Sequence, residues 1–195
     1  MKFDASSHLP KGILEGAMQN THSLIQQNIE VLKQGLEVLN ELDDQAYPEV
    51  RHPFSKYGIG SHFRHCLDFY HAFSKGVELG WIDYDNRQRD EHIERDRLTA
   101  IQKLMEAIEE LGRVSWLHEH TSLMVRLEDA ESDGETSSWS SSTVMRELQA
   151  LVSHTVHHFA LIGLMLQLNG FEIPKEFGVA PSTLNRWRAE TVCAQ

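Results

Sequence analysis

The sequence predicts an all-α protein, a four-helix bundle. Three observations support this: four long segments with apolar residues at helical spacing, a composition typical of globular proteins, and two histidine clusters inside two of those segments. The 195 residues are 41% hydrophobic and 24% charged, with 12 Gly and 5 Pro. A chain of this length buries a substantial core. We expect a single domain over residues 1–195.

The first two helices are predicted from apolar residues three and four positions apart. One pattern runs from about Lys11 to Asp43. Two prolines follow it and favour a loop up to about Gly58, because proline and the residue before it leave the helical conformation. The second pattern begins at Ile59 and closes at Gly80, a residue type that commonly ends helices.

The third helix is predicted after a charged connector over residues 81–97, and it extends to Leu111. Apolar and polar residues then alternate over residues 123–127, and the Asp133-Gly134 pair favours a tight turn. We therefore expect a short β hairpin between the third and fourth helices.

The fourth helix is predicted over Val144–Leu168, after several side chains that can cap its N-terminus. Its apolar run, residues 159–168, is too short for a membrane span of roughly 20 residues, so we expect a buried helix. The residues that follow contain two prolines and a helical turn capped by Ser182. We expect this tail to wrap the bundle.

The charge balance argues against several partners. Eighteen Lys and Arg against 29 Asp and Glu give a net charge of −11, so we expect neither nucleic acid nor a membrane surface as a partner. Two cysteines imply no disulfide framework, and the N-terminal residues do not resemble a signal peptide. We expect a cytoplasmic protein.

The tryptophans are predicted to be packing anchors: Trp81, Trp116, Trp139 and Trp187.

The fourth helix carries a histidine pair with metal-chelating spacing. His154 and His158 are four residues apart, so their side chains differ in direction by only about 40° on a helix. A helical wheel places both at the edge of the apolar face, whereas His157 points further outward. We predict that His154 and His158 face inward and bind a metal.

The second helix offers two further histidines. The wheel places His62 inside the apolar face and His65 at its edge, and either could reach the pair on the fourth helix. Three imidazoles suit Zn, Ni, Fe or Mn and leave a position for water or substrate. Asp68 and Glu147 are candidates to accept a hydrogen bond from the second ring N–H of a ligand histidine. Cys66 is directed about 100° away from His65, which predicts a core residue.

These residues resemble the DinB/YfiT-like superfamily of four-helix-bundle metalloproteins, which is unrelated to the DinB polymerase. The segment from Gly58-Ile59 through His65 and Asp68 is similar to the first motif of that superfamily. The second motif is matched by His154-Thr-Val-His157-His158. The resemblance therefore implies His65, rather than His62, as the ligand from the second helix. It implies a metal site of His65, His154 and His158. His62 is a separate candidate, as a fourth ligand or a supporting residue.

The resemblance also implies an activity class. Relatives use a His-bound divalent metal, some for transfer or isomerisation with a low-molecular-weight thiol and others for hydrolysis-like reactions. We therefore predict a metal-dependent transferase or hydrolase acting on a small molecule, and a homodimer. Many relatives follow the last histidine with Arg-Gly-Gln, but here Phe159-Ala160-Leu161 follows, so the resemblance does not identify a substrate.

Three further hypotheses complete the sequence-based interpretation. Arg87 and Arg89, in the charged connector, could hold carboxylates of a substrate or thiol through bidentate contacts. A different class of function is a non-catalytic metal-binding or stress-associated bundle. A third alternative is a dimeric interaction module in which the histidines are incidental.

Overall fold

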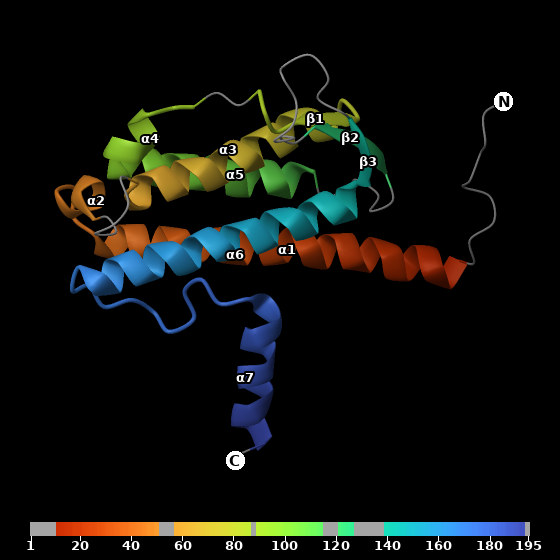
Figure 1. Cartoon of the computed structure of the whole chain (residues 1–195). Helices are drawn as coiled ribbons and strands as arrows, with labels where there is room; N and C mark the ends of the chain where they lie inside the picture. Colours follow the sequence, from red (N-terminus) through yellow and green to blue (C-terminus); the bar gives the residue numbers. More distant parts are fainter. Residues whose placement is uncertain (1–10, 51–56, 87–88, 115–120, 127–138, 194–195) are drawn as a thin grey trace.

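The computed structural model describes residues 11–50, 57–86, 89–114, 121–126 and 139–193. Within these ranges the chain is mainly helical and carries one small sheet (Figure 1). The elements follow in the order α1 (Lys11–Glu41), α2 (Ala46–Glu49), α3 (Ile59–Val77), β1 (Trp81–Asp83), α4 (His92–Arg95), α5 (Arg97–Arg113), β2 (Ser122–Arg126), β3 (Ser140–Thr143), α6 (Val144–Leu168) and α7 (Pro181–Cys193).

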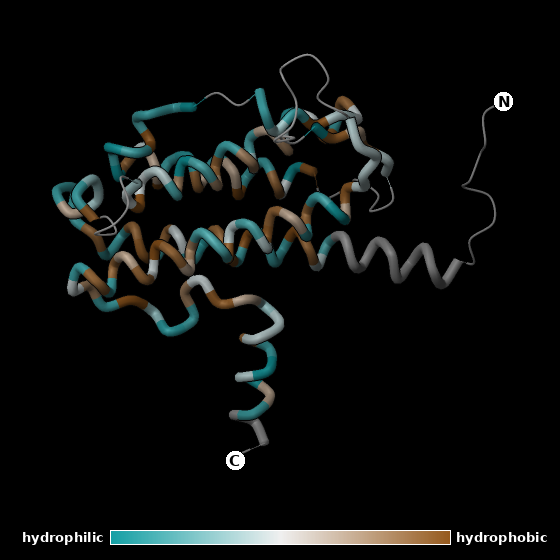
Figure 2. The backbone as a smooth tube through the Cα atoms, viewed as in Figure 1, coloured by the Kyte–Doolittle hydropathy of each residue, from teal (hydrophilic) through white to brown (hydrophobic). Residues whose placement is uncertain are grey.

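Four long helices form the predicted bundle. The helices α1 and α6 lie side by side in one layer, and α3 and α5 lie in the other (Figure 1). Each helix of one layer also contacts one helix of the other, because α3 packs against α6 and α1 packs against α5. Apolar residues recur along all four helices (Figure 2). The fold class predicted from the sequence is confirmed.

The core lies between the two layers. Its aromatic centre includes Phe63 of α3 and Phe159 of α6, whose ring centroids are 5.5 Å apart. Gly35 of α1 faces this pair, and a Cβ atom there would lie 2.8 Å from Phe159 Cζ. Glycine at this position therefore allows α1 to approach the two aromatic rings closely.

A buried polar network fixes α1, α3 and α6 relative to one another. The Tyr70 hydroxyl donates to Asn28 Oδ1 over 2.8 Å, and Asn28 Nδ2 donates to the Leu148 carbonyl over 3.1 Å. The Thr155 hydroxyl lies 3.1 Å from Tyr70 Oη. Tyr70, Asn28 and Thr155 are fully buried, so breaking this network would leave unpaired polar groups inside the core.

The small sheet lies where α6 begins (Figure 1). Its order is β1-β2-β3, with β2 antiparallel to β3 and parallel to β1. The predicted β pairing between the third and fourth long helices is therefore present as β2 and β3, although Asp133-Gly134 lies outside the described residues. The sequence-based prediction missed β1 and the short helices α2 and α4.

The helix α6 has the bounds predicted from the sequence. The Thr143 hydroxyl oxygen accepts a hydrogen bond from the Arg146 N–H and caps its N-terminus. Among the described helices, α6 alone is long and apolar enough to cross a membrane by length and composition, and 44% of its most apolar stretch is buried. In this fold it packs against α1 and α3 as a core helix.

The C-terminal tail first returns along the bundle. Phe177 stacks on Phe159 at 5.0 Å, and the Gly178 N–H donates to Gln34 Oε1 of α1. A Cβ atom at Gly178, whose φ is +70°, would lie 2.5 Å from the Ala160 nitrogen. The wrapping segment is therefore residues 171–180, after which α7 extends away from the bundle (Figure 1).

The tryptophans do not behave as predicted. Trp81, Trp139 and Trp187 are 47%, 40% and 40% exposed, so the packing-anchor prediction is wrong for them. Trp116 lies outside the described residues. The bundle interior is filled instead by Phe, Tyr and aliphatic side chains of the long helices.

Candidate metal centre

The predicted ligands come from two helices that pack directly against each other. His65 lies on α3, and His154 and His158 lie on successive turns of α6. Tyr70, little more than one turn after His65, and Thr155, next to His154, belong to the buried network between these helices. The network therefore also fixes the relative position of the three imidazoles.

The three imidazoles converge through their Nε2 atoms. His154 Nε2 lies 3.1 Å from His65 Nε2 and 3.1 Å from His158 Nε2. The three ligand atoms all lie within 4.8 Å of one another, and the three side chains are partly exposed. This group could hold a metal ion.

The 3.1 Å spacings of His154 from His65 and from His158 match the requirements of a transition metal. Nitrogen ligands about 2.1 Å from one ion, at tetrahedral to octahedral angles, lie roughly 3.0–3.4 Å apart. Hydrogen bonds alone fit poorly, because a neutral ring nitrogen has either one proton or one lone pair. His154 Nε2 faces two other nitrogens, so it cannot form a good hydrogen bond with both. A cation accepts a lone pair from all three nitrogens.

His62 lies behind this group rather than within it. Its Nδ1 is 2.8 Å from His158 Nδ1, the ring nitrogen that does not face the other two ligands. One of these two nitrogens donates and the other accepts, since two neutral imidazoles share the contact. Of the two roles considered for His62, the geometry favours a supporting residue that orients His158.

The electrostatics keep the His158 imidazole available as a neutral ligand. Burial, reinforced by His154, His62 and His157, lowers the pKa of His158 to about 3. The pKa of His62 is also lowered, by burial and by His157. A neutral imidazole has the lone pair that a metal needs. The His158 imidazole is therefore neutral at neutral pH.

Two aromatic rings form one wall of the site. The Phe69 ring lies 4.2 Å from the His154 ring and 5.1 Å from the His65 ring, measured between centroids. Tyr84 stacks on Phe69 at 4.9 Å. The sequence-based analysis missed Phe69, because an aromatic residue at helical spacing is also the normal pattern of a core residue.

Glu147 anchors this wall. Its carboxylate accepts hydrogen bonds from Tyr84 over 2.9 Å and from Ser142 over 2.5 Å. Burial, followed by the charge of Glu147, raises the pKa of the Tyr84 hydroxyl, so it remains a donor at neutral pH. Glu147 was a candidate partner for a ligand imidazole, and its contacts are instead with Tyr84 and Ser142.

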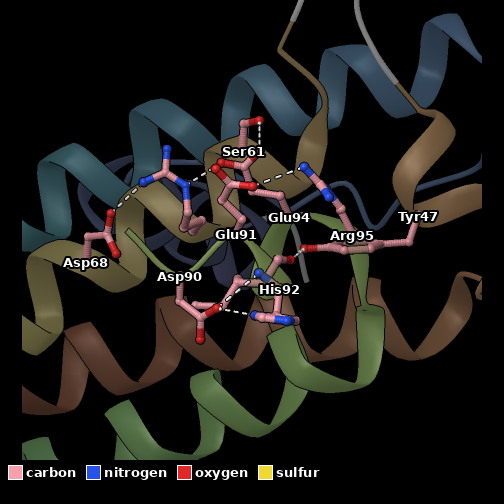
Figure 3. Close-up of polar contacts among 10 residues, drawn as sticks. Tyr47, Ser61, Asp68, Asp90, Glu91, His92, Glu94 and Arg95 are labelled. Carbon is pink, nitrogen blue, oxygen red and sulfur yellow. Dashed lines mark hydrogen bonds and ion pairs between the residues drawn. The ribbon is translucent and has the colours of Figure 1, made fainter. Parts of the chain in front are cut away.

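Asp68 belongs to a clamp between α3 and α4. Arg64 donates to Asp68 over 2.6 Å and to Glu94 over 2.5 Å, and the Ser61 hydroxyl also donates to Glu94 (Figure 3). A Cβ atom at Gly60 would lie 2.1 Å from the Glu94 carbonyl oxygen. The two helices therefore approach closely here. Asp68 contacts Arg64, and its role as a hydrogen-bond partner of a ligand ring stays a prediction.

The other predicted residues are not members of the group of three histidines. Cys66 is buried, as predicted, and burial raises the pKa of its thiol. His157 is the outward residue of its cluster, with its ring 5.1 Å from that of His158. Arg89 is exposed, and Arg87 lies outside the described residues.

Comparison with known proteins identifies the family. The sequence model of the DinB family matches residues 18–179, which include both histidine clusters. The chain belongs to the DinB family. FK506-binding protein 5 from Rhizopus delemar is 35% identical to this DinB-family chain over 106 residues, which are 53% of the chain and 26% of that protein. The chain thus covers only about a quarter of that relative's length. No solved structure matches it.

Proposed function

We propose that this DinB-family protein binds a divalent transition metal through His65, His154 and His158 and is a metal-dependent enzyme. The observation that carries the proposal is the convergence of three Nε2 atoms, with 3.1 Å between neighbouring pairs. That spacing suits a shared cation better than a set of hydrogen bonds. Zn, Ni, Fe and Mn all accept three imidazoles.

Three protein ligands favour catalysis over a purely structural role. Structural zinc sites usually have four protein ligands, whereas catalytic sites keep a position for water or substrate. The contact of His62 with the far nitrogen of His158 supports an orienting role for His62 rather than a role as fourth ligand. The partial exposure of the three ligands is consistent with access from solvent.

The proposed reaction is transfer to a small electrophile with a low-molecular-weight thiol as co-substrate, and the alternative is hydrolysis. A divalent cation supplies Lewis-acid chemistry, which favours a deprotonated thiol or water near neutral pH. The chain's own residues prepare the site. His62 orients His158, Phe69 shields the ligands on one side, and Glu147 fixes Tyr84 against Phe69.

The test compares thiol consumption and hydrolysis in metal-loaded protein. A small epoxide is supplied with a low-molecular-weight thiol, and an ester is supplied without one. Metal-dependent loss of thiol that disappears in His65→Ala supports the transferase, whereas ester cleavage without thiol supports the hydrolase. The matched control is His92→Ala, because His92 is a histidine outside the converging group and its side chain is 89% exposed.

Metal binding without either reaction would favour the non-catalytic, stress-associated alternative. Absence of metal would favour the dimeric interaction module.

We further propose a cytoplasmic homodimer whose partner is a small molecule rather than nucleic acid or a membrane. Analytical ultracentrifugation tests the dimer, and a protein that sediments as a monomer at micromolar concentration would contradict it.

A further inference from the structure

A hollow lies along the second half of α3, beside the short strand β1. Its volume is about 340 Å³, within the range of small-molecule sites. Its lining comes from the second half of α3, from the turn that follows and from β1. None of the three predicted metal ligands lines it, so this hollow is distinct from the metal centre.

One wall of the hollow is apolar and open to solvent. Leu79 and Trp81 line it together with Ala72, and the first two are 63% and 47% exposed. The strand register places Met124 beside Trp81, and Trp139 contacts the Trp81 ring at a centroid distance of 5.8 Å. Large apolar side chains thus gather at this edge, a feature typical of binding surfaces.

The acidic side chains around the hollow are paired with arginines, whereas its lysine, among the described residues, is not in an ion pair. Asp83 and Asp68 also line it, but each carboxylate is already held by a guanidinium group. Arg126 donates to both oxygens of Asp83, over 3.0 and 2.5 Å, and Arg64 donates to Asp68 over 2.6 Å. Lys75 also lines the hollow, and in the described part of the chain it forms no ion pair.

We propose that this hollow binds a small monoanion with an apolar body. The ammonium group of Lys75 takes the anionic group, and Leu79 and Trp81 cover the apolar part. Asp68 and Asp83 repel the anion less than unpaired carboxylates would, because each is paired with an arginine. The site is independent of the proposed metal chemistry, because its recognition groups are different residues.

The experiment uses two fluorescent probes that share one apolar body. The anionic probe is 1-anilinonaphthalene-8-sulfonate, and its neutral counterpart is N-phenyl-1-naphthylamine. Both are titrated into full-length folded protein, with and without added zinc. We expect tighter binding of the sulfonate, energy transfer from tryptophan to it, and the same affinity in both metal states.

Substitutions then locate the site. We expect Lys75→Gln to weaken sulfonate binding about five- to tenfold, the range of a charge-assisted contact near solvent, and to leave the neutral probe unaffected. Lys75→Arg should retain most of the affinity. Trp81→Ala should weaken both probes, since it removes the apolar wall. The control is Lys33→Gln, at an exposed lysine on α1.

Three outcomes would overturn the proposal. The first is no saturable sulfonate binding to wild type. The second is equal affinity for the charged and the neutral probe. The third is the same loss of affinity in Lys75→Gln and Lys33→Gln, which would indicate a general effect of net charge. Circular dichroism of each variant confirms that the loss does not come from unfolding.

Discussion

Two sides of α3 carry polar groups that are organised in opposite ways. On the side toward α4, Ser61, Arg64 and Asp68 pair donors with acceptors in a clamp with Glu94 (Figure 3). On the side toward α6, the histidines of α3 meet other histidines, and nitrogen faces nitrogen. In the clamp each donor meets a carboxylate, whereas the histidine group brings together ring nitrogens of the kind that bind a cation.

This difference separates stability from function within one helix. Removing a member of the clamp leaves a partner charge partly buried, so the cost is expected in the free energy of unfolding. Removing His65 from the other side takes away one of the ring nitrogens that converge on the proposed ion. Its cost is therefore expected in metal affinity.

The largest expected effect is the loss of a ligand. His65→Ala should weaken metal binding about a thousandfold, or about 4 kcal/mol, because a metal site shares its binding free energy among three or four ligands. Competition with a chromophoric chelator measures the affinity. His92→Ala is the matched control, and an affinity for His65→Ala within threefold of wild type would show that His65 is not a ligand.

The next effect concerns the clamp. Arg64→Ala should destabilise the fold by about 3 kcal/mol, since Asp68 would keep a poorly solvated charge without its partner. Arg95→Ala removes the exposed pair with Glu91 and should cost about 0.5 kcal/mol or less. Urea unfolding measures both. If Arg64→Ala lost metal while remaining stable, the separation between the two sides of α3 would be wrong.

His62→Ala should have an intermediate effect on the metal alone. We expect metal affinity to fall about 10- to 100-fold, the usual cost of losing a residue that orients a ligand. The stoichiometry should stay at one ion per chain. The spectrum of the cobalt-substituted protein adds a second measurement, because removing a ligand would change the d–d bands far more than removing an orienting group.

The smallest effect is expected from Tyr70→Phe. This change removes the donor to the buried Asn28 oxygen and should cost about 1.5 kcal/mol in unfolding free energy. Because the network links the ligand-bearing helices, metal affinity should fall slightly as well. Leu98→Ala, at an exposed apolar residue of α5, is the control, and equal stability of the two variants would contradict a role for the network.

The sequence alone predicted those elements whose bounds are set by residues within or next to them. The helix α6 was predicted with its observed bounds, because a capping threonine, a long apolar pattern and Asn169-Gly170 all lie next to it. The strand β1 was missed because three residues carry no periodicity, and its pairing partner Met124 is distant in the sequence.

The histidine group could also be predicted from the sequence, but the contacts of the residues around it could not. The spacing of His154 and His158 reflects one helix, so it could be recognised directly. The choice between His62 and His65 depends on how α3 is rotated against α6, which the family resemblance indicated and periodicity did not. The contact of Tyr84 with Glu147 joins residues 63 positions apart and follows only from the tertiary structure.

The central claim is that three imidazoles share one metal ion. The most direct measurement is elemental analysis of wild type and of a His154→Ala, His158→Ala double variant, each purified without chelators and then reconstituted. The account predicts about one transition-metal ion per wild-type chain and none in the double variant. A wild-type protein that stays free of metal after reconstitution, or a double variant that retains it, would contradict the account.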